Sequence, residues 1–354
     1  MIFDPILNLF RGRAITIPPY DGAFRPNTAL ETAEILHEVA APDNLCQTKD
    51  RILLTSGCDL LQIDPAGAAC MSLAVYPAPI TSLAISPDGK QALSLADGRL
   101  LIDGETIQLS PEIRCITALS FDADDHLYLC NGSDSRPTTD WAVDLMEKGC
   151  RGSVWQISPD GRQPNCLARN LAWPSGILVQ QERLVVSEGW RHRLFSMAKS
   201  GGQPVPMLDK IPGYPGRLTP SRFGGAWLAI FAPRNRLVEF ILQEDDYRRD
   251  MMREIPRSQW IAPSLVPSNS FLDPLQCGAI KTMGVRKPWA PGRSYGLAVR
   301  LDAELQPIAS YHSRADGTHH GITSIAEIDG HIWVAACGGN RLLDLGAVHE
   351  LGAV

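Results

Sequence analysis

The chain has 354 residues, 44% of them hydrophobic, so it is long enough to bury a large core as two or three domains or as one repeat architecture. Its 33 Lys and Arg against 39 Asp and Glu give a net charge of −6, and the basic residues are scattered rather than clustered. This balance does not favour an electrostatic nucleic-acid binder, and we expect no nucleic-acid partner.

The first 32 residues are predicted to form a lead segment before the main domain. The opening MIFDPILNLF carries Asp4 and lacks a basic region and a small-residue cleavage site, so it does not indicate a signal peptide. Its apolar run is too short to cross a bilayer. A helix packed on the domain is the simpler interpretation, and an amphipathic surface anchor is the alternative. We therefore expect a cytoplasmic protein without stable membrane insertion.

Six segments share one pattern of a first strand that opens after a small or polar residue, a turn rich in Asp, Gly or Lys, and an apolar second strand. The segments begin at Pro42, Ile80, Ile116, Pro174, Pro215 and Ile322. Short runs with such close turns indicate antiparallel β-structure rather than helix. Four strands in each segment predict an all-β fold, a six-bladed β-propeller, whose circular closure removes open sheet edges.

The sixth segment ends near Val354 after only three strands. We expect the missing fourth strand in AEILHEVA, residues 33–40, so that the two ends of the chain pair and close the ring. The single propeller domain then covers residues 33–354. It carries two insertions, 131–151 in the third blade and 232–293 in the fifth, and the second insertion includes a predicted helix at EDDYRRDMMREI followed by a Pro-rich loop.

Strand direction predicts where a functional site lies. If each first strand starts near the central axis on the top face, the joins between second and third strands return to that same face. Both insertions fall at such joins, so we expect them to cover the mouth of a central funnel, where loops on a rigid scaffold usually carry function.

The residues predicted to line the funnel come from two sets of positions. The first-strand openings supply Asp43 with Asn44, Ser82, Thr117, Ser175, Gly216 with Arg217, and Thr323. The second-to-third joins supply Asn131, then Glu188, Trp190, Arg191 and His192, then Arg234 with Asn235. His319 and His320 precede the first strand of the last blade.

Several of these residues have a structural interpretation beside the functional one. Asp43 and Asn44 would otherwise cap a turn. Glu188 and Arg191 would form a structural ion pair. Trp190 would pack against its neighbours rather than form a substrate platform.

The histidines and Arg217 divide in the same way. His192 would stabilise its blade, and the adjacent His319 and His320 are weak evidence for a metal site. Arg217 is the least easily explained by structure alone, because an unpaired guanidinium at the axis is costly. It should meet an acid or an anionic ligand, and Asp43 is the nearest protein candidate.

The nine cysteines form no CxxC pair, and several fall within strand-like runs, so we expect most to be buried thiols in a reducing compartment. Cys130 and Cys150 bracket the first insertion, and their pairing is left open. The nucleophile elbow, the Walker loop, the HExxH motif and the dinucleotide fingerprint are all absent.

Several stretches carry a resemblance to a known family: LVVSEGWRHRL, GYPGRL followed by GGAWLAIFAPRN, GITSIAEIDGHIWVA, and the series NGS, DWAVDLMEKG and GSVWQI. On these stretches the chain resembles the strictosidine-synthase-like proteins, their uncharacterised bacterial members above all. These belong to the six-bladed superfamily that includes SMP-30-type gluconolactonases, paraoxonases and the squid-type phosphotriesterase. The resemblance covers roughly residues 33–350 and implies a six-bladed propeller. It also implies a small-molecule enzyme, for which hydrolysis of a lactone or ester is the commonest chemistry.

The metal-dependent hydrolases of that superfamily hold Ca²⁺ or another divalent ion on the axis with Glu, Asn and Asp at first-strand openings. The resemblance places Asp43, Thr117, Ser175 and Gly216 at those positions, with Arg217 next to the last. One carboxylate, two hydroxyls and a guanidinium suit a hard cation poorly. We therefore expect no cofactor. Calcium bound by Asp43 and Asn44 is the disfavoured alternative. In the metal-free case, the positive charge of Arg217 would replace that of the metal ion.

The plant Pictet–Spengler enzymes of the family use a Glu in the last blade, and the resemblance places Thr323 there, while Glu327 should point elsewhere. Strictosidine synthase activity is therefore not expected. A hydrolase would use Arg217 to polarise a carbonyl oxygen and Asp43, Glu188 or His320 as general base. Predicted substrate contacts are Asn44, Asn131, Ser175, Trp190, Arg191, His192, Arg234, Asn235 and Thr323. The alternative is a non-catalytic propeller that binds a metabolite or a protein partner, which the loss of metal ligands favours.

Overall fold

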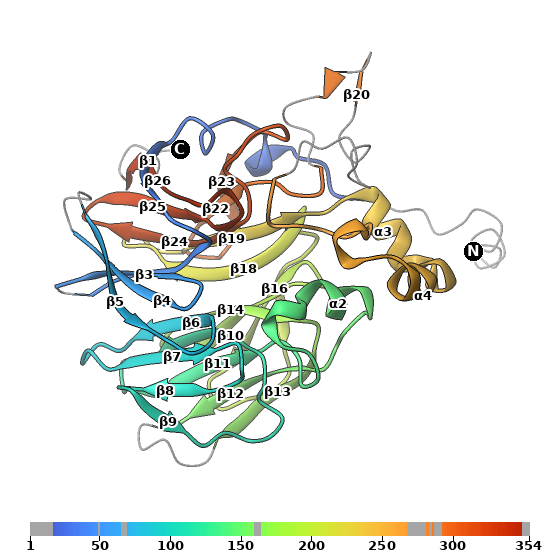
Figure 1. Cartoon of the computed structure of the whole chain (residues 1–354). Helices are drawn as coiled ribbons and strands as arrows, with labels where there is room; N and C mark the ends of the chain where they lie inside the picture. The colour runs from blue at the N-terminus through green and yellow to red at the C-terminus, as the bar shows by residue number, and fades with distance from the viewer. Residues whose placement is uncertain are drawn as a thin grey trace.

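The computed structural model of the chain describes residues 17–48, 50–64, 69–158, 164–267, 281–282, 285–286 and 292–348. Six antiparallel four-stranded sheets surround a central axis and form a six-bladed β-propeller, which confirms the predicted fold class (Figure 1). The opening MIFDPILNLF lies outside the described residues.

The first three blades contain strands that follow one another in the chain. The first blade is β2 (Pro42–Gln47), β3 (Ile52–Ser56), β4 (Asp59–Ile63) and β5 (Cys70–Val75). The second is β6 (Ile80–Ile85), β7 (Gln91–Leu95), β8 (Leu100–Ile102) and β9 (Glu105–Ile107). The third is β10 (Ile116–Phe121), β11 (Leu127–Asn131), β12 (Gly152–Ile157) and β13 (Asn165–Leu171).

The last three blades include the long insertion and the closure. The fourth is β14 (Pro174–Val179), β15 (Arg183–Glu188), β16 (Arg193–Ala198) and β17 (Val205–Leu208). The fifth is β18 (Gly213–Pro220), β19 (Ala226–Pro233), β22 (Leu297–Leu301) and β23 (Pro307–His312). The sixth is β24 (Ile322–Ile328), β25 (His331–Ala336), β26 (Arg341–Ala347) and β1 (Glu34–Glu38).

The ring closes by pairing the two ends of the chain. Strand β1 lies antiparallel to β26 as the outermost strand of the last blade, with Glu34 opposite Asp344 and Glu38 opposite Arg341. The prediction that residues 33–40 supply the missing strand is confirmed. Before β1, the short 3-10 helix η1 (Gly22–Phe24) follows Tyr20, whose hydroxyl donates to the carbonyl of Pro212 at 3.0 Å, and Leu30 is fully buried.

The innermost strand of every blade is irregular near its start. The pairing register shifts at Asn44 and Leu45, Thr81, Thr117, Ser175, Gly216 and Arg217, and Thr323. A β-bulge inserts an extra residue, bends the strand and re-aims a side chain. The same small irregularity in six blades therefore supplies equivalent positions around one axis.

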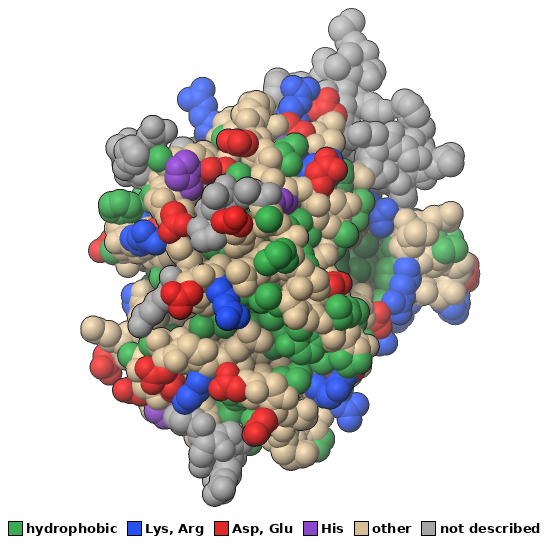
Figure 2. Space-filling view, turned by 60° about the vertical axis from the view of Figure 1, so that its left-hand side comes forward, with side chains coloured by type: hydrophobic (Ala, Val, Ile, Leu, Met, Phe, Trp, Pro, Cys, Tyr) green, Lys and Arg blue, Asp and Glu red, His purple; other side chains and the backbone are tan. Residues whose placement is uncertain are grey.

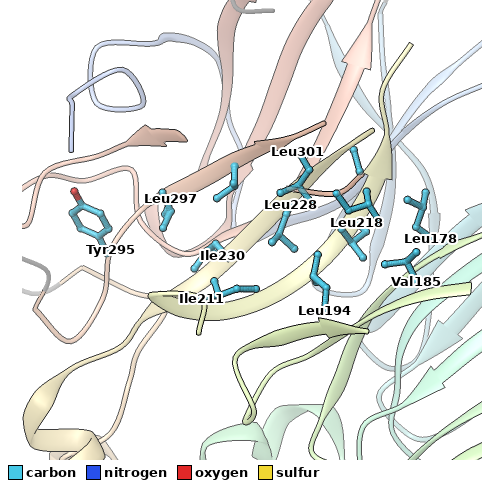
Figure 3. Close-up of a cluster of buried hydrophobic side chains, with 13 residues drawn as sticks. Leu178, Val185, Leu194, Ile211, Leu218, Leu228, Ile230, Tyr295, Leu297 and Leu301 are labelled. Carbon is cyan, nitrogen blue, oxygen red and sulfur yellow. The ribbon is translucent and has the colours of Figure 1, made fainter. Parts of the chain in front are cut away.

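The hydrophobic core lies between the blades rather than at the axis. Six clusters of buried side chains each span two neighbouring blades. Figure 3 shows the cluster between the fourth and fifth blades, where Leu178 and Val185 face Leu218 and Leu228. Burial of a Leu or Val side chain stabilises a fold by about 1.5–3 kcal/mol, so these interfaces fix how the blades sit around the axis.

Both insertions contain helices. The insertion in the third blade holds η2 (Thr138–Asp140) and α2 (Trp141–Met146). The one in the fifth holds α3 (Arg236–Gln243), α4 (Asp245–Glu254), η3 (Arg257–Gln259) and the short strands β20 (Lys281–Thr282) and β21 (Val285–Arg286). Helix α4 is the predicted one. The insertions contact each other through a shared apolar cluster and two ion pairs, Lys148–Asp245 and Arg257–Asp140, both at 2.7 Å.

The surface agrees with the composition, whereas the cysteines are less buried than predicted. On the face in Figure 2, basic and acidic side chains are interspersed and hydrophobic side chains gather near the centre of the view, so this face carries no extended basic region. No helix within the described ranges is long and apolar enough to span a bilayer. Of the eight described cysteines, two are buried, five are partly buried and Cys150 is exposed, so the prediction that most are buried is wrong. Buried Cys130 and exposed Cys150 are both free thiols, so they form no disulfide.

A buried histidine predicts how the stability of the fold depends on pH. His312 is fully buried, with Nε2 2.7 Å from the Ser310 hydroxyl and Nδ1 3.2 Å from the Tyr295 hydroxyl. Burial lowers the pKa of His312 from 6.5 to about 4. Between these two pH values the unfolded chain holds a proton that the folded chain does not.

The free energy of unfolding should therefore fall by about 3 kcal/mol as the pH drops from neutral to 4, because His312 charges only on unfolding. Urea unfolding of wild type and of His312→Gln at pH 7 and pH 4.5 measures this contribution as the difference between the two proteins. Equal losses on acidification in both would show that His312 is not responsible.

Candidate functional site

A cavity of about 250 Å³ lies where the six innermost strands begin, beneath the two insertions. Its floor is made by one or two residues from each blade: Asp43, Thr81, Thr117, Ser175, Gly216 with Arg217, and Thr323. Its walls and roof are Pro79, Ile80, Ala96, Thr138, Thr139, Trp141, Trp173, Phe231 and Leu265. The structure thus brings the first-strand openings together. In the second blade the lining residue is Thr81 rather than the expected Ser82, because the bulge falls at the second residue of the inner strand, as it does at Thr117 and Thr323.

Hydroxyl groups on the floor link three pairs of neighbouring blades. Thr117 Oγ1 donates to the carbonyl of Pro174 at 2.6 Å, and Ser175 Oγ donates to that of Pro215 at 2.7 Å. Thr323 Oγ1 donates to Pro42 in the first blade at 3.3 Å. Because these hydroxyl protons are already donated to carbonyls, the three oxygens can offer a ligand only their lone pairs.

An ion pair crosses the centre of the floor. Arg217 Nη1 donates to Asp43 Oδ1 at 2.7 Å and to the carbonyl of Thr323 at 3.3 Å, while Nη2 donates to the carbonyl of Thr81 at 2.6 Å. The guanidinium of the fifth blade therefore joins the first, second and sixth. These three bonds use three of its five N–H groups, so Nε–H and one N–H of Nη2 are left for other contacts.

The carboxylate of Asp43 also keeps bonding capacity. Its Oδ1 accepts from Arg217 and from the backbone N–H of Asn44 at 2.8 Å, whereas Oδ2 has no hydrogen bond within the described part of the chain. The Asp43 and Arg217 side chains are 22% and 19% exposed, and no other described residue that lines the cavity is ionisable. The floor therefore offers one carboxylate oxygen and one guanidinium edge in a mostly apolar space.

Aromatic rings form one side of the cavity. Trp141 meets Phe231 edge to face with ring centroids 5.6 Å apart, and Trp173 stacks on Trp190 at 5.2 Å. Trp190 stands behind this wall, where its Nε1 donates to Asp144 at 2.8 Å. Burial raises the pKa of Asp144. The prediction that Trp190 contacts substrate stays untested, but its position is that of a support for the wall.

Sequence reasoning missed the rings that line the cavity. Trp141 lies in the DWAVDLMEKG stretch of the first insertion, Trp173 directly precedes the strand at Pro174, and Phe231 lies within the apolar strand GAWLAIF. The position of Trp173 before a first-strand opening is a signal that would have placed it. Nothing in the local sequence distinguishes Phe231 from core residues.

Glu188 is placed away from the cavity. It is fully buried, and its Oε1 accepts from the backbone N–H of Ala172 at 2.7 Å and from Arg191 at 2.5 Å. Its Oε2 accepts from Arg193 Nε at 2.6 Å. Every one of these contacts holds the end of β15 to its neighbours, so the geometry fits the structural ion pair better than the general base.

Four further candidates support loops beside the site. His192 Nδ1 lies 3.0 Å from the Gly213 carbonyl, and burial lowers the pKa of His192. Arg234 Nε donates to Glu239 at 2.9 Å. Asn235 Oδ1 accepts from the first turn of α3. Asn131 Oδ1 accepts two backbone N–H groups, those of Arg114 and Cys115. None of the four lines the cavity.

The two adjacent histidines are also outside the cavity lining. His320 Nδ1 lies 2.8 Å from the Ser294 hydroxyl and its Nε2 lies 2.7 Å from the Arg314 carbonyl. His319 Nδ1 lies 2.8 Å from the Leu30 carbonyl. The structure therefore does not bring His320 to the floor where Asp43 lies.

The axial donor set does not fit a divalent cation. Asp43 is the one carboxylate among the described residues that line the cavity, and its Oδ1 is bonded to Arg217. The Asn44 amide lies in the next layer down. Hard cations take six or more oxygen ligands, and a guanidinium in contact repels them. Within the described ranges, one group of three potential ligands lies close enough for a metal, Asp122, Asp124 and His126, and it is on the β10–β11 turn.

Comparisons with known proteins give distant similarity. No family model matches the chain. Over 113 residues, 30% of the chain, it is 26% identical to the adipocyte plasma membrane-associated protein of Danio rerio, and over 159 residues, 42% of the chain, it is 24% identical to that of Salmo salar. These matches span only 27% and 38% of the relatives' own length.

Solved structures of similar fold cover most of the chain. The calcium-binding protein regucalcin of Agrobacterium tumefaciens superposes with a TM-score of 0.57 at 13% identity, covering 89% of this chain and 94% of its own. A gluconolactonase of Xanthomonas campestris gives 0.55 at 12% identity, covering 88% of each chain. At this level of identity the likeness establishes the propeller fold.

Proposed function

We propose that this chain is a small-molecule hydrolase of the lactone or ester type, and that it works in the axial cavity without a divalent metal. The observation that carries the proposal is the floor beneath the aromatic and aliphatic walls. There Asp43 Oδ2, which accepts no hydrogen bond from a described residue, lies beside a guanidinium with two N–H groups that no described residue accepts. The gluconolactonase name of one structural neighbour agrees with this reaction type.

In this proposal the two floor residues divide the chemistry. The unused N–H of Arg217 Nη2 donates to the carbonyl oxygen of the substrate and stabilises the negative charge that develops there. Asp43 Oδ2 accepts a proton from the attacking water, whose oxygen adds to the carbonyl carbon. When the tetrahedral intermediate collapses and the C–O bond to the alkoxide breaks, Asp43 returns that proton to the alkoxide oxygen and is again ionised. The apolar walls exclude bulk water and so strengthen both interactions. The ion pair leaves the floor neutral overall, which suits an uncharged ester or lactone.

Membership of the strictosidine-synthase-like proteins stays a prediction, and strictosidine synthase activity is not part of the proposed function. Thr323 stands on the cavity floor with its hydroxyl bonded to Pro42, and a hydroxyl cannot supply the carboxylate chemistry of the plant enzymes. Glu327 accepts from Trp227 Nε1 at 2.8 Å and lines a different cavity.

Hydrolysis is expected to be independent of metal. The full chain, dialysed against EDTA, should hydrolyse members of a panel of lactones and aryl esters at the rate seen before dialysis, and added Ca²⁺ should not raise kcat, because Arg217 supplies the positive charge at the floor. Products are identified by mass spectrometry, with the metal content of each sample measured in parallel. Loss of turnover with EDTA and recovery with Ca²⁺ would contradict the metal-free mechanism.

A non-catalytic binding role is the second candidate, and it too rests on the floor. Three N–H groups of Arg217 already donate hydrogen bonds within the protein. Such bonds fit a structural role that joins the blades as well as they fit a catalytic role. A thermal-shift screen on the same panel separates the two functions. Stabilisation by a compound that is never converted to product favours binding alone.

A further inference from the structure

A second cavity, of about 420 Å³, lies directly beneath the first along the axis. Its lining residues follow those of the upper floor by one or two positions along each inner strand: Asn44, Ser82, Ala118, Ile177 and Ser324. Among the described residues, Arg217 is the one that lines both cavities. We call this second cavity the lower chamber. One layer of residues, crossed by the Arg217 side chain, separates it from the candidate site.

Two polar atoms of that layer are buried without a partner in the described part of the chain. Asn44 is 3% exposed, and its Nδ2 donates to Thr55 Oγ1 at 2.9 Å while the Thr55 hydroxyl donates to the Asp43 carbonyl at 3.1 Å. This chain of donors fixes which way the amide points and leaves Asn44 Oδ1 as an unused acceptor. Arg217 Nε is an unused donor. A buried polar group without a partner destabilises the fold, so a ligand that bonds both atoms would bind favourably.

The charges of the lower chamber favour an anion. Arg217 and Arg222 contribute two guanidinium groups. With the described part of the chain, the Arg222 guanidinium makes one long hydrogen bond, 3.5 Å to Gln47. Glu327 is the one carboxylate among the described lining residues, and its oxygens already accept from Trp227 Nε1 and from the backbone N–H of Arg222. The counter-ion of Arg217, Asp43, lines the upper cavity instead.

We propose that the lower chamber is a second binding site, for a small hydroxycarboxylate. The hydroxyl of such a ligand donates to Asn44 Oδ1, and its carboxylate accepts from Arg217 Nε–H. The ligand must supply both groups, because a plain carboxylate would leave the Asn44 oxygen facing a negative charge. Leu119, Phe121 and Leu218 leave room for a short aliphatic chain beside these two contacts.

Occupation of the lower chamber should be coupled to the upper cavity. A carboxylate on Nε–H shares the charge of the guanidinium whose Nη1 holds Asp43. A ligand in the lower chamber and a ligand in the upper cavity therefore change each other's affinity by an equal factor. One consequence rests on the proposed function. Hydrolysis of a lactone yields a hydroxycarboxylate, so the reaction product would belong to the class of ligand that the lower chamber binds.

The test is direct binding, which does not depend on turnover. The full chain, labelled at isoleucine methyl groups, is titrated with glycolate and followed by NMR. The methyls of Ile85 and Ile177 report on the lower chamber and that of Ile80 on the upper cavity. We expect saturable shifts at Ile85 and Ile177 with a Kd on the order of 1–10 mM, the range open to so small a ligand, and at least tenfold weaker binding of acetate and of ethylene glycol.

Variants complete the test. Asn44→Asp keeps the size of the side chain and tolerates the left-handed backbone at this position, φ 52°, but puts a negative charge beside the ligand. It should weaken glycolate binding at least tenfold, and Ser120→Leu, which fills the lower chamber without touching either polar contact, should abolish it. Thr139→Ala, which changes the upper cavity alone, should leave it unchanged.

Three results would overturn the proposal. Shifts confined to Ile80 would place the ligand in the upper cavity. Shifts at no methyl would mean that water alone fills the lower chamber. Equal binding by wild type and a folded Asn44→Asp variant would remove the role of Asn44. If the protein proves not to hydrolyse esters or lactones, the glycolate titration still tests the lower chamber, because it measures binding without a substrate.

Discussion

Substitution of Arg217 by methionine should reduce kcat/KM for the hydrolysed substrate at least ~100-fold, the loss typical when one charge-stabilising donor is removed from an active site. Methionine keeps the unbranched shape of the side chain but removes the donor that faces the substrate carbonyl. The same change leaves the Asp43 carboxylate, 22% exposed, without its counter-ion. Because the pair is partly solvated, we expect a loss of about 2 kcal/mol of stability, between the values for exposed and fully buried pairs.

Two matched variants separate catalysis from structure. Arg217→Lys keeps the positive charge and loses the forked geometry, so it should retain most of the stability and little of the activity. Asp43→Asn keeps a hydrogen-bond acceptor for Arg217 and loses the general base, so it should lower kcat more than it raises KM. Activity is measured at saturating and limiting substrate, and stability by urea unfolding. If Arg217→Met keeps the turnover and the ligand binding of the wild type, the axial cavity is not the active site.

Substitution of Glu188 by glutamine should cost about 3 kcal/mol of stability, because it breaks a buried charge network and leaves donors of Ala172, Arg191 and Arg193 facing an amide. Glu188 is fully buried at the end of β15, whereas the cavity floor lies elsewhere. Turnover per folded molecule should therefore stay at the wild-type value. Urea unfolding gives the first quantity, and kcat normalised to folded protein gives the second.

The neighbour Arg191 provides the control. Its side chain is 43% exposed, so Arg191→Ala should cost at most about 1 kcal/mol, the usual range for an exposed ion pair. Arg193, 21% exposed, still neutralises Glu188 in that variant. A Glu188→Gln variant that stays stable and loses catalysis would restore Glu188 as the general base predicted from sequence.

The site was predictable where it follows from the repeat and unpredictable where it follows from long-range contacts. Positions such as Asp43, Ser175 and Thr323 could be placed on the axis because each opens the same strand in its repeat. The joins between second and third strands could be placed on the same face, but not the direction of their side chains. His192 bonds to the carbonyl of Gly213, and Asn235 bonds to that of Gly292 in the second insertion. Nothing in the local sequence distinguishes such structural hydrogen bonds from contacts to a substrate.

The sequence by itself determined the six blades, the strand that closes them, the two insertions and the meeting of Asp43 with Arg217. It could do so because the alternation of apolar and polar residues and the repeated segments can be read locally. In a ring of similar blades, residues at equivalent repeat positions must lie around the same axis. The tertiary structure alone decided that Trp141, Trp173 and Phe231 wall the upper cavity, that Glu188 and His320 stay away from it, and that a second chamber lies below. Those outcomes depend on how the insertions pack over the axis and on which distant groups satisfy each buried polar atom, and neither can be read from the pattern of any one segment.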